Sequence, residues 1–165
     1  CGHVRLAQWG PTGYGKMGSF EGFCSGGGIA QLAQTMVREE LQQGKKPLLC
    51  PTVEELDQLT AARVAKFASG GDPLALHIYE QVGTMLGMGL SMLIDILNPQ
   101  KIVIGSIFAR AQHLLWPAAE KVIRQETLSI AREACQVVPA GLTESVGDIS
   151  ALTVADYYYA RSKQG

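Results

Sequence analysis

The sequence predicts a helix-rich α/β domain with only a few strands. Two observations support this prediction. A long helical segment, Pro73–Leu97, is followed by a short apolar strand, Lys101–Ile104, that ends in small residues. A second helical segment, a second strand and a last helix then follow in that order. Helices that alternate with short buried strands are typical of α/β architectures, which bind ligands at the carboxyl ends of their strands.

The first predicted helix covers residues 29–43, where apolar side chains recur at helical spacing. Gly44 follows this segment and is expected to end the helix. After a loop with two prolines, Thr52 and Glu55 have the T-x-x-E pattern of a capping box. The pattern predicts that another helical turn begins there.

The next two predicted helices have strong start signals. Thr60 is an N-cap for a helix over residues 61–68, and Asp72 is an N-cap followed by Pro73 at the first helical position. Each glycine inside the long helix lowers its stability by about 1 kcal/mol relative to alanine. We therefore expect another helix to cross this one closely, or a ligand to approach it, at its small residues, which are Gly83, Gly87, Gly89 and Ser91.

The carboxyl-terminal part begins where Asn98 and Pro99 end the long helix. The predicted elements that follow are the strand Lys101–Ile104, a helical segment over residues 108–128 that restarts at Pro117, a strand over residues 134–138, and a final helix over residues 149–161 capped by Asp148. The final helix carries Tyr157, Tyr158 and Tyr159. We expect an ordinary amphipathic terminus there, with packing against another lobe or subunit as the alternative.

Composition narrows the classes of function. The chain has 14 basic and 15 acidic side chains among 165 residues, so its charge balance does not indicate nucleic-acid binding. The longest apolar stretch, residues 82–97, is too short and too interrupted to cross a membrane. The four cysteines, which are Cys1, Cys24, Cys50 and Cys135, form no C-x-x-C pair. They are typical of buried thiols in a reducing compartment and predict a cytoplasmic protein.

The stretch from Gly10 to Met17 reads G-x-x-x-x-G-K-M, which is close to the phosphate-binding loop of nucleotide hydrolases. That loop needs a Ser or Thr after the lysine to hold magnesium, and a long helix directly afterwards. Met17 cannot bind a hard cation, and the next residues include Gly18, Phe20 and Gly22. We therefore reject the phosphate-loop interpretation, which leaves a former metal site or a sugar pocket.

Short motifs in a fixed order extend over nearly the whole chain. They are Gly-His-Val-Arg-Leu at residues 2–6, Gly-Lys-Met-Gly-Ser-Phe-Glu at 15–21, Ser-Gly at 25–26, Gly-Asp-Pro-Leu-Ala at 71–75, Gly-Met-Gly at 87–89, Leu-Asn-Pro at 97–99 and Ile-Val-Ile-Gly at 102–105. This ordered set resembles the carboxyl-terminal half of ROK proteins, the repressor and sugar-kinase family that includes bacterial glucokinases. The resemblance implies the actin-like, ribonuclease H-like ATPase fold, with sugar and ATP bound between two lobes. It implies that residues 1–165 are a carboxyl-terminal fragment, part of the large lobe, and that the amino-terminal lobe lies outside this chain.

The zinc signature of the family is incomplete in this chain. In the family, a Gly-His is followed by Cys-x-Cys-Gly-x-x-Gly-Cys-x-Glu. The two glycines and the glutamate are present, but the three cysteines are replaced by Thr12, Tyr14 and Ser19. A structural zinc ion needs about four nitrogen or sulfur ligands. No zinc is therefore expected.

The resemblance also implies the site residues. His3 and Glu21 match residues that contact sugar hydroxyls, and these side chains supply suitable donors and acceptors. Gly105, Ser106 and Ile107 match the glycine-rich turn that faces the nucleotide, although Ile107 is bulky for such a turn. An ordinary strand-to-helix turn remains the alternative for these three residues.

The implied whole protein is an ATP-dependent hexose kinase that uses ATP with Mg and phosphorylates the 6-hydroxyl of a hexose or amino-hexose. The catalytic aspartate would lie in the amino-terminal half, so no catalytic residue is assigned to this chain. The alternative is a sugar-sensing transcriptional repressor of the same family, which would bind nucleic acid only through an upstream helix-turn-helix. A non-catalytic interaction module that binds no sugar is a third possibility. The family resemblance further implies a homodimer.

Overall fold

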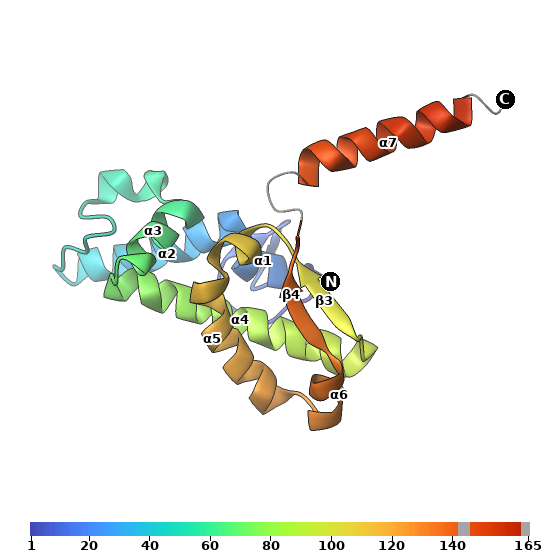
Figure 1. Cartoon of the computed structure of the whole chain (residues 1–165). Helices are drawn as coiled ribbons and strands as arrows, with labels where there is room; N and C mark the ends of the chain where they lie inside the picture. The colour runs from blue at the N-terminus through green and yellow to red at the C-terminus, as the bar shows by residue number, and fades with distance from the viewer. Residues whose placement is uncertain (142–145, 163–165) are drawn as a thin grey trace.

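A computed structural model describes residues 1–141 and 146–162, and it confirms the predicted helix-rich α/β class (Figure 1). The longest helix, α4 (Pro73–Leu97), runs through the body of the molecule, and α5 (Ile107–Glu126) packs along it. The other elements are β1 (Thr12–Gly13), β2 (Lys16–Met17), α1 (Phe20–Cys24), α2 (Gly26–Gln42), the 3-10 helix η1 (Val53–Gln58), α3 (Ala61–Ser69), β3 (Lys101–Ile104), α6 (Ser129–Ala134), β4 (Gln136–Pro139) and α7 (Val146–Ser162).

The strands form two small sheets. β1 and β2 are an antiparallel hairpin, in which Thr12 is opposite Met17. β3 and β4 are parallel, and their register runs from Lys101 opposite Gln136 to Ile104 opposite Pro139. Both parallel strands therefore end at the same edge, where the turn after β3 begins. The second strand starts later than the predicted residues 134–138, because Ala134 is the last residue of α6.

Local capping signals confirm three of the predicted helix ends. The Thr60 hydroxyl accepts a hydrogen bond from the Arg63 amide at 3.1 Å, and a carboxylate oxygen of Asp72 accepts one from the Ala75 amide at 2.8 Å. Asn98 has the left-handed conformation that ends α4, with φ 45° and ψ 52°. These ends were predictable because each depends on one side chain and its immediate neighbours.

One predicted cap is absent, and one predicted helix start was wrong. A helical turn begins after Thr52 as predicted, but it is a 3-10 helix and Thr52 makes no side-chain cap. This turn is tied to α2 by a 3.2 Å hydrogen bond from the Gln34 side chain to the Leu56 carbonyl. The helix expected from residue 29 begins earlier, at Gly26, because Ser25 caps it and accepts a hydrogen bond from the Gly28 amide.

Two predictions in the carboxyl-terminal part were also wrong. α5 is broken at Ala111 (φ −126°, ψ 29°) and continues through Pro117, where the restart was predicted. Proline disturbs the helix at the carbonyl four residues earlier, which is His113, so the break at Ala111 lies outside the turn that Pro117 affects directly. Asp148 lies in the first turn of α7 and does not precede that helix.

The glycines of α4 allow α5 to pack closely against it. This agrees with the first of the two predicted explanations, in which another helix crosses the long helix at its small residues. A Cβ added to Gly83 would lie 2.6 Å from the Leu115 carbonyl oxygen, and one added to Gly87 would lie 2.7 Å from the Ala119 carbonyl oxygen. The loss of helix propensity at these glycines is therefore offset by backbone contact between the two longest helices.

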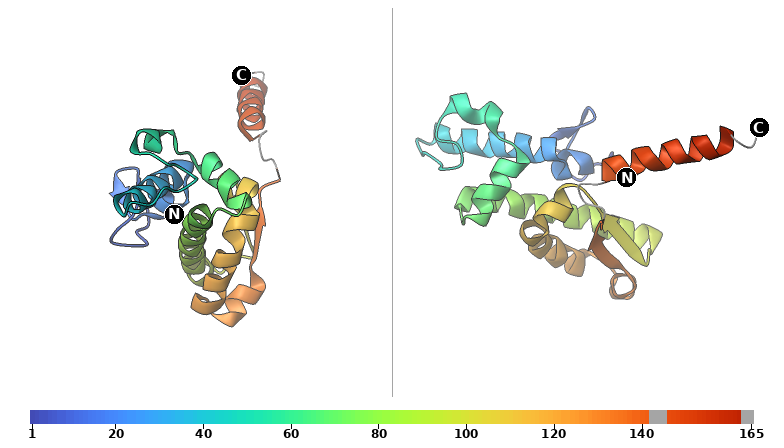
Figure 2. Two further views of the ribbon diagram at one scale, coloured as in Figure 1. Left: turned by 90° about the vertical axis from the view of Figure 1, so that its left-hand side faces the viewer. Right: turned by 45° about the horizontal axis from the view of Figure 1, so that its top comes forward.

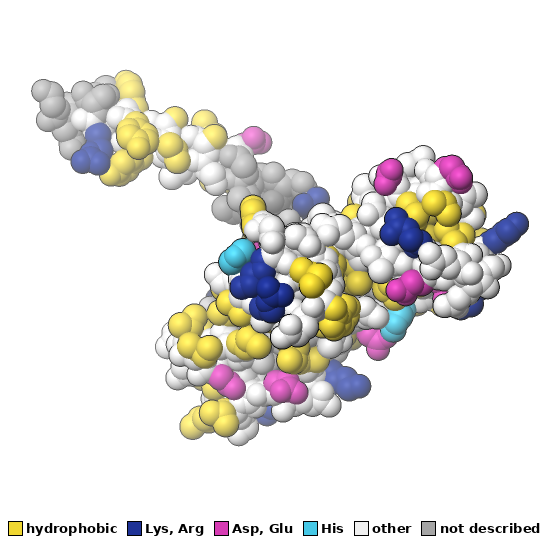
Figure 3. All heavy atoms as spheres, turned by 180° about the vertical axis from the view of Figure 1, so that it is seen from behind, with side chains coloured by type: hydrophobic (Ala, Val, Ile, Leu, Met, Phe, Trp, Pro, Cys, Tyr) yellow, Lys and Arg dark blue, Asp and Glu magenta, His cyan; other side chains and the backbone are white. Residues whose placement is uncertain are grey.

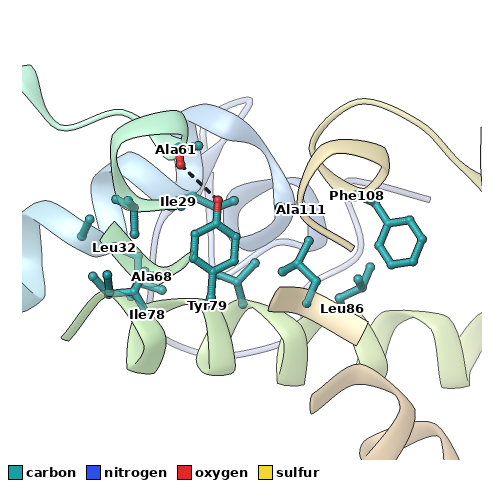
Figure 4. Packing of buried hydrophobic residues seen from close by; sticks show 14 of the residues in the cluster. Ile29, Leu32, Ala61, Ala68, Ile78, Tyr79, Leu86, Phe108 and Ala111 are labelled. Atoms are coloured by element: carbon teal, nitrogen blue, oxygen red, sulfur yellow. Dashed lines mark hydrogen bonds between the residues drawn. The ribbon is translucent and has the colours of Figure 1, made fainter. Parts of the chain in front are cut away.

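Tyr79 is the largest fully buried side chain of the core and makes a testable contact. Its ring extends from α4 toward α3, and its hydroxyl donates a 3.0 Å hydrogen bond to the Ala61 carbonyl (Figure 4). Burial raises the pKa of Tyr79 to about 12. Because the pKa is higher in the folded state, the protonated hydroxyl favours folding below pH 10, and this contribution is lost as the pH rises toward 12.

We expect the substitution Tyr79→Phe to lower the free energy of unfolding by about 1 kcal/mol near neutral pH, since it removes the buried hydrogen bond from the Tyr79 hydroxyl to the Ala61 carbonyl. It should also make the stability less sensitive to pH above 10. Urea unfolding at a series of pH values measures both effects. Equal losses of stability in both proteins between pH 10 and 12 would contradict this role for Tyr79.

The cysteines are less uniformly buried than the sequence predicted. Cys50 is buried, Cys24 and Cys135 are half-buried, and Cys1 is exposed, so the expectation of a buried thiol is wrong for Cys1. All four are free thiols. In the parts of the chain that the structure describes, no helix has the length and apolar character needed to cross a membrane.

α7 projects away from the body of the molecule in all three ribbon views (Figures 1 and 2). Its exposed apolar side chains are Ile149, Leu152, Val154, Tyr157, Tyr158 and Tyr159. At helical spacing these positions lie on every side of the helix. The prediction of an amphipathic terminus is therefore wrong, since α7 has no separate polar face.

Candidate functional site

A cleft of about 320 Å³ brings the two groups of predicted site residues together. One wall is formed by Glu21 and the residues that join α1 to α2, and the other by the turn from β3 into α5, Gly105 to Phe108. α4 contributes Val82 and Leu86. One predicted sugar-binding residue and all three predicted nucleotide-binding residues thus line the same cavity.

A larger groove of about 610 Å³ lies between α2 and the first turns of α4. It is lined by Trp9, Glu39 and His77 among others, and it contains none of the predicted site residues. Size alone therefore does not select the candidate site. The smaller cleft is preferred because residues with a predicted chemical role meet there.

Glu21 is positioned by a helix that the sequence did not predict. It lies in the first turn of α1, and Ser19 caps this helix by accepting a 3.1 Å hydrogen bond from the Gly22 amide. Ser19 is fully buried. Ser19 stands where the family's zinc signature has a cysteine, and its hydroxyl stabilises the start of the helix that carries Glu21.

His3 lies beside Glu21 along the backbone. The Glu21 amide donates a 2.8 Å hydrogen bond to the Gly2 carbonyl, and the Phe20 amide donates one of 2.8 Å to the Val4 carbonyl. His3 lies between these two acceptors, but it is exposed and does not line the cleft. Within residues 1–141 and 146–162, neither the His3 imidazole nor the Glu21 carboxylate has a hydrogen-bond or ion-pair partner.

Basic side chains surround this edge of the site. Lys16 donates a 2.8 Å hydrogen bond to the His3 carbonyl, and Arg5 donates one of 2.9 Å to the Met17 carbonyl. Figure 3 shows Lys and Arg side chains gathered beside a histidine on one face of the molecule. These contacts fix the β1–β2 hairpin against the amino-terminal segment.

Thr12 and Tyr14 stand where the family's zinc signature has its other two cysteines, and both lie in the β1–β2 hairpin. The backbone of Thr12 exchanges two hydrogen bonds with the Gln31 side chain, at 3.0 and 3.1 Å. Tyr14 is 86% exposed and lies in the hairpin turn with φ 47°. The described part of the chain contains no group of three or more His, Cys, Asp or Glu side chains that could hold a metal ion.

Cys24 lines the cleft near Glu21 and was not assigned a role from the sequence. Burial, and then the negative charge of Glu21, raise the pKa of the Cys24 thiol far above its ordinary value. The thiol is therefore protonated at neutral pH and is a poor nucleophile. The adjacent Ser-Gly motif at residues 25–26 was the only signal in the sequence that this segment faces the site.

The turn after β3 has a backbone conformation typical of glycine, although only the first of its three residues, Gly105, is a glycine. Ser106 has φ 53° and ψ −123°, a conformation that strongly favours glycine. Ile107 then begins α5, and its Cδ1 would lie 3.5 Å from a Cβ added to Gly26 on the opposite wall.

Ser106→Gly is expected to stabilise the protein by about 1 kcal/mol, because it relieves the strain of a positive φ at a residue with a Cβ. The control is Ser129→Gly at the first position of α6, where φ is not positive and the added flexibility should destabilise. Thermal unfolding of the two variants measures the difference. A lower melting temperature for Ser106→Gly would contradict the strain argument.

A profile of the ROK family matches residues 1–157 of the chain. The chain is 30% identical to the DNA-binding transcriptional dual regulator NagC of Escherichia coli K12 over 142 residues. The aligned region covers 86% of this chain and 33% of that protein. It is 33% identical to the glucokinase of Halalkalibacterium halodurans over 112 residues. That alignment covers 67% of this chain and 33% of the glucokinase. The chain thus spans about a third of the length of these relatives.

Two solved structures extend this similarity. One is a ROK family transcriptional regulator described as a homolog of the E. coli MLC protein, with a TM-score of 0.65 and 29% identity over 84% of this chain and 33% of that one. The other is a ROK family glucokinase from Streptomyces griseus in complex with glucose and AMPPNP. Its TM-score is 0.70 at 23% identity, over 88% of this chain and 47% of that one.

Proposed function

Since the chain belongs to the ROK family and has part of its actin-like ATPase fold, we propose that it supplies sugar-binding residues and one nucleotide-binding wall of an ATP-dependent hexose kinase. In this proposal the chain is the carboxyl-terminal part of the large lobe, and the catalytic aspartate and the other lobe belong to the rest of the protein. The substrate is a hexose or amino-hexose, and the whole protein is a homodimer.

The observation that carries the proposal is the shared cleft. A kinase must hold the sugar hydroxyl and the γ-phosphate of ATP within reacting distance. Glu21 and the turn of Gly105, Ser106 and Ile107 line opposite walls of one cavity of about 320 Å³. A sugar held by Glu21 would therefore lie next to a nucleotide that approaches the turn.

Each residue has a role suited to its chemistry. An ionised carboxylate accepts hydrogen bonds from two neighbouring hydroxyls, and an imidazole offers one donor and one acceptor, so Glu21 and His3 can bind a sugar. Gly105 leaves its backbone open, because among the described residues a Cβ there would meet only Ala140, at 3.7 Å. ATP with Mg, when bound, supplies the phosphoryl group and neutralises its developing charge.

The test uses the purified protein at its full natural length. Calorimetry with a panel of hexoses and amino-hexoses should find a ligand, and a coupled assay should detect ADP release that depends on that sugar. A protein that binds none of the panel would contradict the proposed sugar site. One that binds a sugar without releasing ADP would contradict the kinase assignment alone.

A second candidate is a sugar-sensing transcriptional repressor without kinase activity. It is favoured by the branched Ile107 side chain in the nucleotide-facing turn, and by the similarity to NagC. The sugar would then shift a conformational equilibrium without being phosphorylated. DNA binding that changes on addition of the sugar, with no ADP release, would support this candidate and exclude the first.

A further inference from the structure

Ile107 lines the cleft and lies close to the wall that contains Gly26. It is the first residue of α5, and it lines the cavity together with Gly26, the first residue of α2. Its Cδ1 and Cγ1 would lie 3.5 and 3.9 Å from a Cβ at Gly26, which is van der Waals distance. Gly26 has no Cβ, so the Ile107 side chain lies close to the Gly26 backbone beside the turn.

The part of the cleft that this chain forms is small. Sites for small ligands commonly measure about 300–1,000 Å³, and this cavity of about 320 Å³ lies at the lower end of that range. A nucleotide is much larger than a hexose, so occupation of both subsites requires more room than a hexose alone. A bulky side chain that lines the nucleotide side of the cleft therefore affects the larger ligand first.

The Ile107 side chain cannot easily move aside. A β-branched side chain has few allowed χ1 rotamers at the start of a helix. Ile107 is half-buried and packs against the hydrophobic core, in which its neighbour Phe108 is almost fully buried. Rotation away from Gly26 would expose apolar surface that is now covered.

The backbone before Ile107 is nevertheless suited to a close approach. Ser106 keeps a glycine-type conformation, and among the described residues only Ala140 lies close to where a Cβ of Gly105 would be. The obstruction in this turn is therefore the Ile107 side chain and not the course of the main chain.

We propose that Ile107 is a specificity-determining residue that narrows the nucleotide side of the cleft, so that the protein binds a hexose in preference to an adenine nucleotide. The inference rests on the proposed function, since it assumes that Glu21 faces the sugar and that the turn faces the nucleotide. It assigns to one side chain the difference in affinity between two ligands that bind side by side in the cavity.

The experiment compares Ile107→Ala with the unsubstituted protein at full natural length. Titrations with ADP and AMPPNP should show at least about tenfold tighter nucleotide binding in Ile107→Ala. Affinity for the hexose identified in the panel should change less than about twofold. The matched control is Ile130→Ala on α6, because Ile130 is 80% exposed and lies outside the cleft lining. This control should leave both affinities unchanged.

Nucleotide affinity in folded Ile107→Ala within about twofold of the unsubstituted protein would overturn the inference. Failure to bind any hexose in the unsubstituted protein would instead contradict the proposed function, so the two failures are distinguishable. If Ile107→Ala does not fold, Ile107→Val removes one methyl-sized group and should tighten ADP binding by a smaller factor. Unchanged ADP binding in folded Ile107→Val would then overturn the inference.

Discussion

Replacement of Glu21 by glutamine should weaken hexose binding by about 10- to 100-fold. Hydrogen bonds to an ionised group contribute about 1.5–3 kcal/mol, and 1.4 kcal/mol corresponds to a factor of ten in affinity. The amide of glutamine is nearly the same size, but it is neutral and has only one oxygen acceptor. The Glu21 carboxylate has no partner in the described parts of the chain, so the substitution should leave the fold intact. Isothermal titration with the preferred sugar measures the loss.

The matched control for this prediction is Glu133→Gln on the exposed side of α6. It removes the same charge at a residue outside the cleft lining and should leave the affinity unchanged. Equal affinities in Glu21→Gln and the unsubstituted protein would remove Glu21 from the sugar site. Equal losses in both glutamine variants would show that net charge, and not contact with the sugar, controls binding.

The substitution Gly28→Ala should lower the free energy of unfolding by about 3 kcal/mol. A Cβ at this position would lie 1.6 Å from the Gly22 carbonyl oxygen, which belongs to the backbone of α1. The backbone cannot yield without moving α1 away from α2. Because α1 carries Glu21, the same substitution should weaken hexose binding. Urea unfolding and sugar titration of one preparation test both expectations.

The neighbouring residue provides an internal control for this prediction. A Cβ added to Gly27 would meet no atom of residues 1–141 and 146–162 within 4 Å, so Gly27→Ala should stabilise α2 by up to about 1 kcal/mol through helix propensity. The two substitutions add the same methyl group to the same helical turn. Similar effects of both on stability would contradict the close contact between α1 and α2.

The candidate site could be named from the sequence but not assembled from it. His3, Glu21 and the turn of Gly105, Ser106 and Ile107 were predicted because short motifs resemble those of the ROK family. The meeting of Glu21 with that turn depends on packing between segments far apart in the chain, for which the sequence carries no local signal. Cys24 was missed for the same reason, since its place in the cleft wall follows from how α1 and α2 pack.

The sequence by itself determined the ends of helices at Thr60, Asp72 and Asn98, the strand Lys101–Ile104, and the family. These features depend on hydrogen bonds or backbone conformations of a few adjacent residues. Only the tertiary structure decided that the glycines of residues 26–28 are helical and that α5 bends at Ala111. It also brought the two halves of the site into one cleft. The physical reason is that glycine allows many backbone conformations and proline restricts them. The conformation adopted near such residues therefore depends on the distant segments that pack against them in the folded protein.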